Sequence, residues 1–225
     1  MVHLAESLTF SGRKVVAAWA SLPFPAHRGR SLPEILCSHL PAVPWALLSP
    51  CGEQNISGCF AQSVVLRGIP KENPISCPGN PPASPLHTCG SSEEALQGYL
   101  DALFPGVLST SHLLEQPCPT RPPYPQFFSR LLTSQGFLLD RPPRYSSPAV
   151  ESIPVLAALQ SAPVLHQLLS GLSKDLQKLK VRRWPSFFTA GVEEEEFHEA
   201  LEELRTLAQC YKTGFDESED EADSD

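Results

Sequence analysis

The sequence lacks the motifs with which common enzyme classes surround a reacting group. It has no G-x-S-x-G nucleophile elbow, no P-loop, no G-x-G-x-x-G fingerprint, no H-E-x-x-H zinc motif and no C-x-x-C pair. His198-Glu199 begins like the zinc motif, but the residue four positions after His198 is Glu202. We therefore expect a non-enzymatic protein without a bound cofactor.

Long apolar runs are also missing. Prolines and charges interrupt every stretch well before the roughly 18 consecutive apolar residues of a membrane-spanning helix. No secretory apolar region follows the first residues, and the seven cysteines form no closely spaced pairs, which favours reduced thiols. We expect a soluble nuclear or cytoplasmic protein. The first 33 residues carry the cations Arg13, Lys14, Arg28 and Arg30 against the single acid Glu6, which keeps a mitochondrial location as an alternative.

What is abundant is proline, with 24 residues in a chain of 225, about twice the usual share of about 5%. Apolar residues make up 41%, enough for one sizeable domain or two small ones. Six prolines stand in residues 70–92, which predicts a linker. The expected organisation is a mixed α/β region over 1–69, this linker, a helical region over 93–213 and a disordered acidic tail over 214–225.

Before the linker, the patterns predict short elements. Residues 13–22 and 32–40 are expected to form short helices, and Pro33 suits a first helical turn. Residues 43–48 and 59–69 read as strands, and the turn-rich segment between them favours a β-hairpin.

After the linker, two short helices are predicted. Ser91 and Glu94 form a capping box, and Pro105 ends the helix that follows. Residues 126–134 carry Phe and Leu at helical spacing before Gly136. The expected fold class is therefore mainly α (α+β).

The strongest pattern lies near the end of the chain. Two segments carry apolar residues at alternating steps of four and three, which is typical of amphipathic helices. We predict an antiparallel αα-hairpin over residues 162–212, whose apolar seam binds protein partners. The seam residues are Leu165, Leu169, Leu172, Leu176 and Leu179 in the first helix, and Phe197, Leu201, Leu204 and Tyr211 in the second.

Charge divides sharply along the chain. Residues 1–192 carry 15 Lys/Arg and 11 Asp/Glu, whereas residues 193–225 carry 2 and 14. A weakly basic body with a strongly acidic end does not favour direct contact with nucleic acid. The basic stretch 174–183, followed by Trp184 as a stacking surface, keeps a nucleic-acid-associated protein as an alternative.

Scattered cysteines and histidines provide another alternative, a zinc-binding or thiol-dependent enzyme. Their spacings are looser than the C-x₂₋₄-C pairs of structural zinc sites, so buried free thiols explain them as well. The residues concerned are Cys37, His39, Cys51, Cys59, Cys77, His87 and Cys89.

Two linear motifs complete the candidate sites. Pro142, Pro143 and Tyr145 match the PPxY ligand of WW domains. Ser218, followed by three acids, matches the substrate pattern of acidophilic kinases. The expected function is an adaptor or accessory subunit of a multiprotein complex, with a phosphorylated tail.

Overall fold

The structure is a computed structural model. The described residues are 6–38, 46–47, 58–70, 85–121, 128–143, 149–191 and 193–213. By the density of their internal contacts, they group into two compact units. One contains the sheet described next, and the other contains the C-terminal helices. The predicted linker and domain boundaries stay predictions, because much of 70–92 and all of 214–225 lie outside the described residues.

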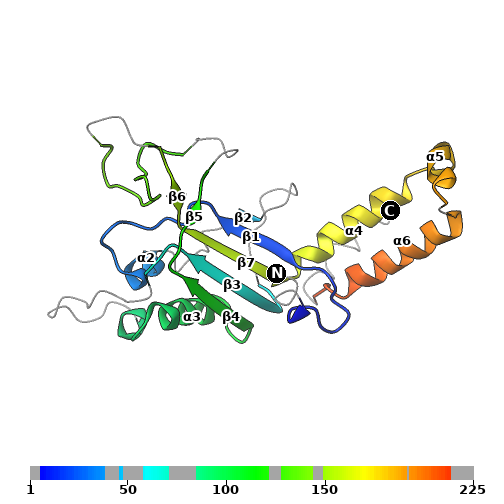
Figure 1. The fold of residues 1–225 in the computed structure, drawn as a ribbon. Coiled ribbons are helices and arrows are strands. Elements are labelled where there is room, and N and C mark those ends of the chain that lie inside the picture. Colours follow the sequence, from blue (N-terminus) through cyan, green and yellow to red (C-terminus); the bar gives the residue numbers. More distant parts are fainter. Residues whose placement is uncertain are drawn as a thin grey trace, which may run out of the picture. The chain divides into compact units, whose positions relative to one another are not determined.

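The central feature is a β-sheet, so the predicted mainly α fold class is wrong and the fold is mixed α/β. Within the described residues, the sheet has five strands in the order β2-β1-β7-β3-β4 (Figure 1). Their bounds are Ala17–Ser21 (β1), Ala46–Leu47 (β2), Ala61–Arg67 (β3), Leu108–Leu114 (β4) and Val155–Ser161 (β7).

Strand pairing also corrects the predicted β-hairpin between residues 43–48 and 59–69. β2 pairs with β1, with Trp19 opposite Leu47, and β3 pairs with β4 instead. The β3–β4 pair is parallel, which requires a long crossover connection, and α3 (Ser92–Leu103) lies in that connection. The turn-rich segment between residues 43–48 and 59–69 therefore does not connect two strands that are neighbours in the sheet.

The predicted helix over residues 13–22 is wrong, because this segment contains the strand β1. Nearly every residue of β1 is buried, and Trp19 is 1% exposed. A strand buried on both faces reads as a short continuous apolar run, which periodicity does not distinguish from a helix.

The helices with capping signals form where the sequence predicts them. α2 spans Leu32–Ser38, and the Ser31 backbone N–H donates to the Glu34 carboxylate at 3.1 Å. The Ser91 hydroxyl caps α3 by accepting from the Glu94 backbone N–H at 3.2 Å. The donor and the acceptor of each of these hydrogen bonds lie three residues apart, so the sequence pattern alone predicts where the two helices begin.

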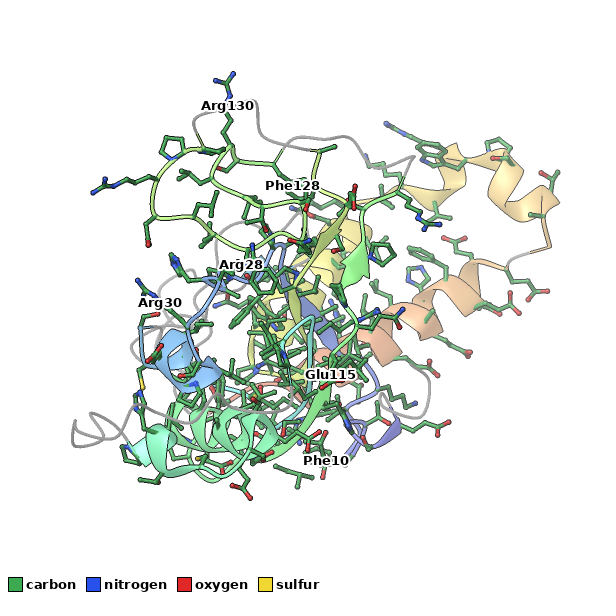
Figure 2. The ribbon with its side chains drawn as sticks, turned by 60° about the vertical axis from the view of Figure 1, so that its left-hand side comes forward. Phe10, Arg28, Arg30, Glu115, Phe128 and Arg130 are labelled. Carbon is green, nitrogen blue, oxygen red and sulfur yellow. The ribbon has the colours of Figure 1, made fainter. Side chains whose placement is uncertain are left out.

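The predicted helix over residues 126–134 is wrong. In the part that is described, from 128, the chain makes turns and an isolated bridge between Leu132 and Leu138. Leu132 packs with Val150, Ile153 and Val155 in a small apolar cluster. Figure 2 shows Phe128 and Arg130 on this irregular segment. Leu132 and Phe128 thus pack in the core of a loop, whereas Leu131 is 36% exposed.

Beside this cluster lies a short two-stranded ribbon. β5 (Cys118–Pro119) pairs antiparallel with β6 (Ser152–Ile153). Gly136, with φ of +78°, lies so close that an added Cβ would stand 2.7 Å from the Ile153 Cα atom. Only glycine combines this backbone conformation with this approach.

The sheet contains a buried polar chain that ties three strands together. Gln160 on β7 donates from Nε2 to Oε1 of Gln62 on β3 at 2.7 Å, and Gln62 donates to the Ser109 hydroxyl on β4 at 2.9 Å. Both glutamines are fully buried. The two glutamine side chains reach these partners only when the three strands are aligned as they are here. The buried hydrogen bonds therefore favour this register of β7, β3 and β4.

The remaining helices follow β7. They are α4 (Val164–Gln177), the short helices η2 (Val181–Arg183) and α5 (Pro185–Thr189), and α6 (Glu194–Gln209). No helix among the described residues is long and apolar enough to cross a membrane.

Candidate interaction surface on the helical hairpin

α4 and α6 run side by side in opposite directions and form the predicted αα-hairpin (Figure 1). α6 begins with a capping box in which the Glu193 backbone N–H donates to the Glu196 carboxylate at 3.0 Å. Acids in this first turn also suit the positive end of the helix dipole. The acidic run from Glu193 to Glu196 therefore starts the helix as well as charging its surface.

The base of the hairpin is held by two side chains that reach backbone groups. The Tyr211 hydroxyl donates to the Val15 carbonyl at 2.6 Å and accepts from the Val15 N–H at 2.8 Å. Between the helices, Nδ1 of His166 lies 2.9 Å from the Ala208 carbonyl oxygen. Burial raises the pKa of the Tyr211 phenol, so the neutral form is favoured.

Burial is concentrated at this base. Leu165, Leu201 and Tyr211 from the predicted seam are buried, as is Ala208. Toward the other end, called the tip here, Leu169, Leu176, Phe197 and Leu204 are only partly buried. The apolar pattern therefore extends beyond the part that the two helices cover.

Two leucines of the predicted seam stand largely in the open. Leu172 is 50% exposed and Leu179 is 49% exposed, while the neighbouring Ser173 is 3% exposed. Successive residues of a helix point about 100° apart. α6 therefore covers the Ser173 side of α4 and leaves part of the leucine stripe free. Sequence reasoning missed Ser173, although Ser170, Ser173 and Gln177 also follow helical spacing.

The leucines of α4 and of the turn after it that are exposed or partly buried follow one side of the helix. We call this side the leucine face and define it as Leu172, Leu176 and Leu179. Another side of the hairpin is polar. It carries a hollow of about 270 Å³ lined by Ser170, Ser173, Lys174, Gln177, Arg205, Ala208 and Gln209. α4 thus has one apolar side and one polar side.

The two helices of the hairpin carry opposite charge. α4 and the turn after it carry Lys174, Lys178, Lys180 and Arg183, with the single acid Asp175. α6 and its cap carry seven glutamates and the single cation Arg205. Trp184, which is 61% exposed, lies at the tip between them. The hairpin therefore offers apolar surface between a basic and an acidic edge.

Two ion pairs on the hairpin join residues of the same helical segment. Lys178 lies 3.0 Å from Asp175, and Arg205 lies 2.5 Å from Glu202. Both pairs are exposed and join residues three apart, so each contributes only a few tenths of a kcal/mol, about 0.2 to 0.5. Apolar contacts dominate the stability of the hairpin.

A groove of about 960 Å³ runs along the acidic edge. The lining includes Gly12, Lys14, Glu199, Glu203 and Cys210. Lys14 is thus a cation beside a row of carboxylates. Ala200, Leu204 and Leu207 line the same groove and add apolar surface to it.

The predicted cysteine and histidine site is only partly described. His39, Cys51 and Cys77 lie outside the described residues, and in the described part no group of three or more His, Cys, Asp or Glu side chains is placed to hold a metal ion. Burial raises the pKa of the Cys59 thiol to about 12, which disfavours the nucleophilic thiolate at that position.

The linear motifs are described in part. Pro142 and Pro143 are exposed, but Tyr145 lies outside the described residues, as does Ser218. Both motifs stay predictions.

A further hollow, which sequence reasoning missed, lies before α2 and measures about 330 Å³. Its rim includes His27, Arg28 and Arg30, and Figure 2 shows both arginines on the same turn. Asp140 lies 3.7 Å from His27 Nδ1 and 3.9 Å from Arg30 Nη2, so it offsets part of the positive charge.

The sequence is similar to proteins named misato homolog 1. It is 52% identical to the Homo sapiens protein over 216 residues, which cover 95% of this chain and 37% of that protein. It is 41% identical to the Danio rerio protein over 231 residues, which cover 100% of this chain and 39% of that protein. Protein misato of Drosophila melanogaster is 27% identical over 94% of this chain and 38% of its own length.

No family model matches the chain. The chain spans less than two fifths of the length of these relatives. The names specify no reaction, ligand or location. Over nearly its whole length, this chain is therefore similar to one part of the misato homolog 1 proteins.

Proposed function

We propose that this chain is a non-enzymatic adaptor or accessory subunit of a nuclear or cytoplasmic multiprotein complex. Its partners bind through the apolar residues of the hairpin and through the acidic C-terminal segment, which is phosphorylated at Ser218. The observation that carries the proposal is the leucine face, where Leu172 and Leu179 are each about half exposed.

The physical support is the cost of leaving apolar side chains in water. Each Å² of apolar surface removed from water contributes roughly 25 cal/mol, so covering these leucines favours association. Exposed apolar patches with polar rims mark protein contact sites. A layer of two helices also buries its apolar side completely only against another layer.

Recovery of partners from cells tests this proposal. Leu172→Glu with Leu179→Glu should abolish cross-links between partner proteins and Lys178, located by mass spectrometry. Since both leucines are half exposed, the variant should remain folded, which circular dichroism checks.

Gln167→Glu with Gln177→Glu is the matched control, because it adds the same charge to exposed positions outside the leucine face. Partner cross-links should survive in this control. Equal recovery with both variants would refute the proposed use of the face.

A further inference from the structure

The polar hollow between α4 and α6 has a lining that consists almost entirely of hydrogen-bond donors. Lys174 and Arg205 supply two cations, while two serines and two glutamines supply hydroxyl and amide groups. Among the described residues, no Asp or Glu lines this hollow. Two cations without a carboxylate favour an anionic ligand.

One hydroxyl at this hollow is buried without a hydrogen-bond partner. Ser173 is 3% exposed, and its Oγ atom bonds to no group among the described residues. A serine inside a helix commonly bonds to the carbonyl oxygen four residues earlier, here that of Leu169, but this bond is not formed. An unpaired buried hydroxyl is unfavourable. A serine rotamer that faces the hollow lets this hydroxyl donate to an oxygen of a ligand.

The acids near this part of α6 lie on a different side of the helix. Glu199, Glu202 and Glu203 line the acidic groove described above, and none of them lines the polar hollow. Glu202 pairs with Nη1 of Arg205. A guanidinium has five N–H donors, so this pair leaves donors of Arg205 available for a second anion.

We propose that this hollow binds a phosphate group through the Lys174 ammonium, the Arg205 guanidinium and the hydroxyls of Ser170 and Ser173. Ammonium and guanidinium groups form charge-assisted hydrogen bonds with phosphate oxygens. The volume of about 270 Å³ lies below the range of roughly 300–1,000 Å³ for pockets that enclose drug-sized ligands. The hollow therefore suits free phosphate or one phosphorylated side chain. The inference goes beyond the proposed function, because no residue of the leucine face lines this hollow.

Isothermal titration calorimetry of the full chain with inorganic phosphate, at constant ionic strength, measures the affinity. The wild type should show saturable binding. Lys174→Gln with Arg205→Gln should weaken this binding about tenfold or more, because two charge-assisted hydrogen bonds are lost. Lys178→Gln with Lys180→Gln is the matched control, since it removes the same charge from exposed residues that do not line the hollow. Its affinity should stay within about twofold of the wild type, because salt screens charges outside the site.

Ser173→Ala separates a binding role from a structural one. Without phosphate, the urea midpoint of this variant should equal or exceed that of the wild type, because the variant removes an unpaired buried hydroxyl. Its affinity for phosphate should nevertheless fall severalfold, since the ligand loses a donor. Unchanged affinity would overturn the role of this hydroxyl in the site.

Titration with O-phosphoserine distinguishes the source of the phosphate group. Tighter binding of O-phosphoserine than of inorganic phosphate assigns the site to a phosphorylated side chain, and the opposite order assigns it to free phosphate. Serine without phosphate should not bind. The proposal is overturned if neither phosphate compound binds the wild type saturably, or if the double variant at Lys174 and Arg205 binds phosphate as well as its control does. Either result would leave the proposed function intact, because that function is tested on the leucine face.

Discussion

At the scale of single residues, Tyr211 connects the end of the hairpin to a distant part of the chain. It is fully buried and bonds both backbone groups of Val15, 196 positions away in the chain. A side chain that bonds a partly buried N–H and C=O together replaces the partners that a regular strand would provide. One phenol therefore anchors the C-terminal end of α6 to the beginning of the described chain.

We predict that Tyr211→Phe lowers the free energy of unfolding by about 1–3 kcal/mol, because both Val15 groups lose their partner. Urea unfolding at neutral pH measures this effect. An unchanged midpoint and slope would contradict the role assigned to the hydroxyl.

The same variant predicts a pH dependence. Burial holds the pKa of the folded Tyr211 phenol above the ordinary value of 10.0, so the folded state retains its proton to higher pH than the unfolded chain. This contribution is complete below pH 10 and is lost as pH rises through the folded pKa. The stability difference between wild type and Tyr211→Phe should therefore shrink above pH 10. Burial raises the pKa of Tyr99 as well, but both proteins retain Tyr99, so its effect cancels in the difference.

At the scale of elements, a helix or strand was predicted correctly when the interactions that form it join residues close together in the sequence. α3 has Ser91 and Glu94 within its own first turn, and the hairpin helices repeat their apolar residues every three or four positions. β1 has no such signal, because its pairing strand β2 lies about 25 positions later and both its faces are buried. Strand partners are chosen by the whole sheet, which periodicity in one segment does not reveal.

The candidate site shows the same limit. The sequence identifies Leu165 and Leu172 as members of one stripe, yet the structure buries the first and half exposes the second. Which part of a stripe meets the other helix depends on the rotation of each helix about its axis. That rotation is set at the base by His166 and Tyr211, through contacts with residues distant in the chain.

A glycine in α4 allows a test of whether a higher helix propensity in α4 raises the free energy of unfolding of the protein. Gly171 lies inside the helix, and an added Cβ would meet no atom within 4 Å. We predict that Gly171→Ala stabilises the protein by about 0.5–1 kcal/mol, because alanine loses less backbone entropy in a helix. Urea unfolding measures it. Gly136→Ala is the contrasting control and should destabilise, since its φ of +78° and its 2.7 Å approach to Ile153 leave no room for a side chain. A loss of stability at Gly171 would indicate that this helix surface is covered.

At the scale of the whole molecule, net charge and packing are separated along the chain. Residues 214–225 carry seven Asp/Glu and no Lys/Arg, so removing them would change the net charge from −8 to −1. The buried apolar side chains of the described residues precede this segment. Solubility and folding stability should therefore respond differently to its removal.

We predict that deleting residues 214–225 leaves the melting temperature within about 2 °C of the full chain. The segment contains a single aromatic residue, Phe215, and no aliphatic side chain larger than alanine, so its burial contributes little. A change of 1 kcal/mol would shift the melting temperature of a protein of this size by about 2–4 °C. Calorimetry measures the shift, and Phe215→Ala in the full chain is the control for the aromatic residue alone. A larger decrease on deletion, reproduced by Phe215→Ala, would mean that this residue packs against the folded part and that the segment is no independent tail.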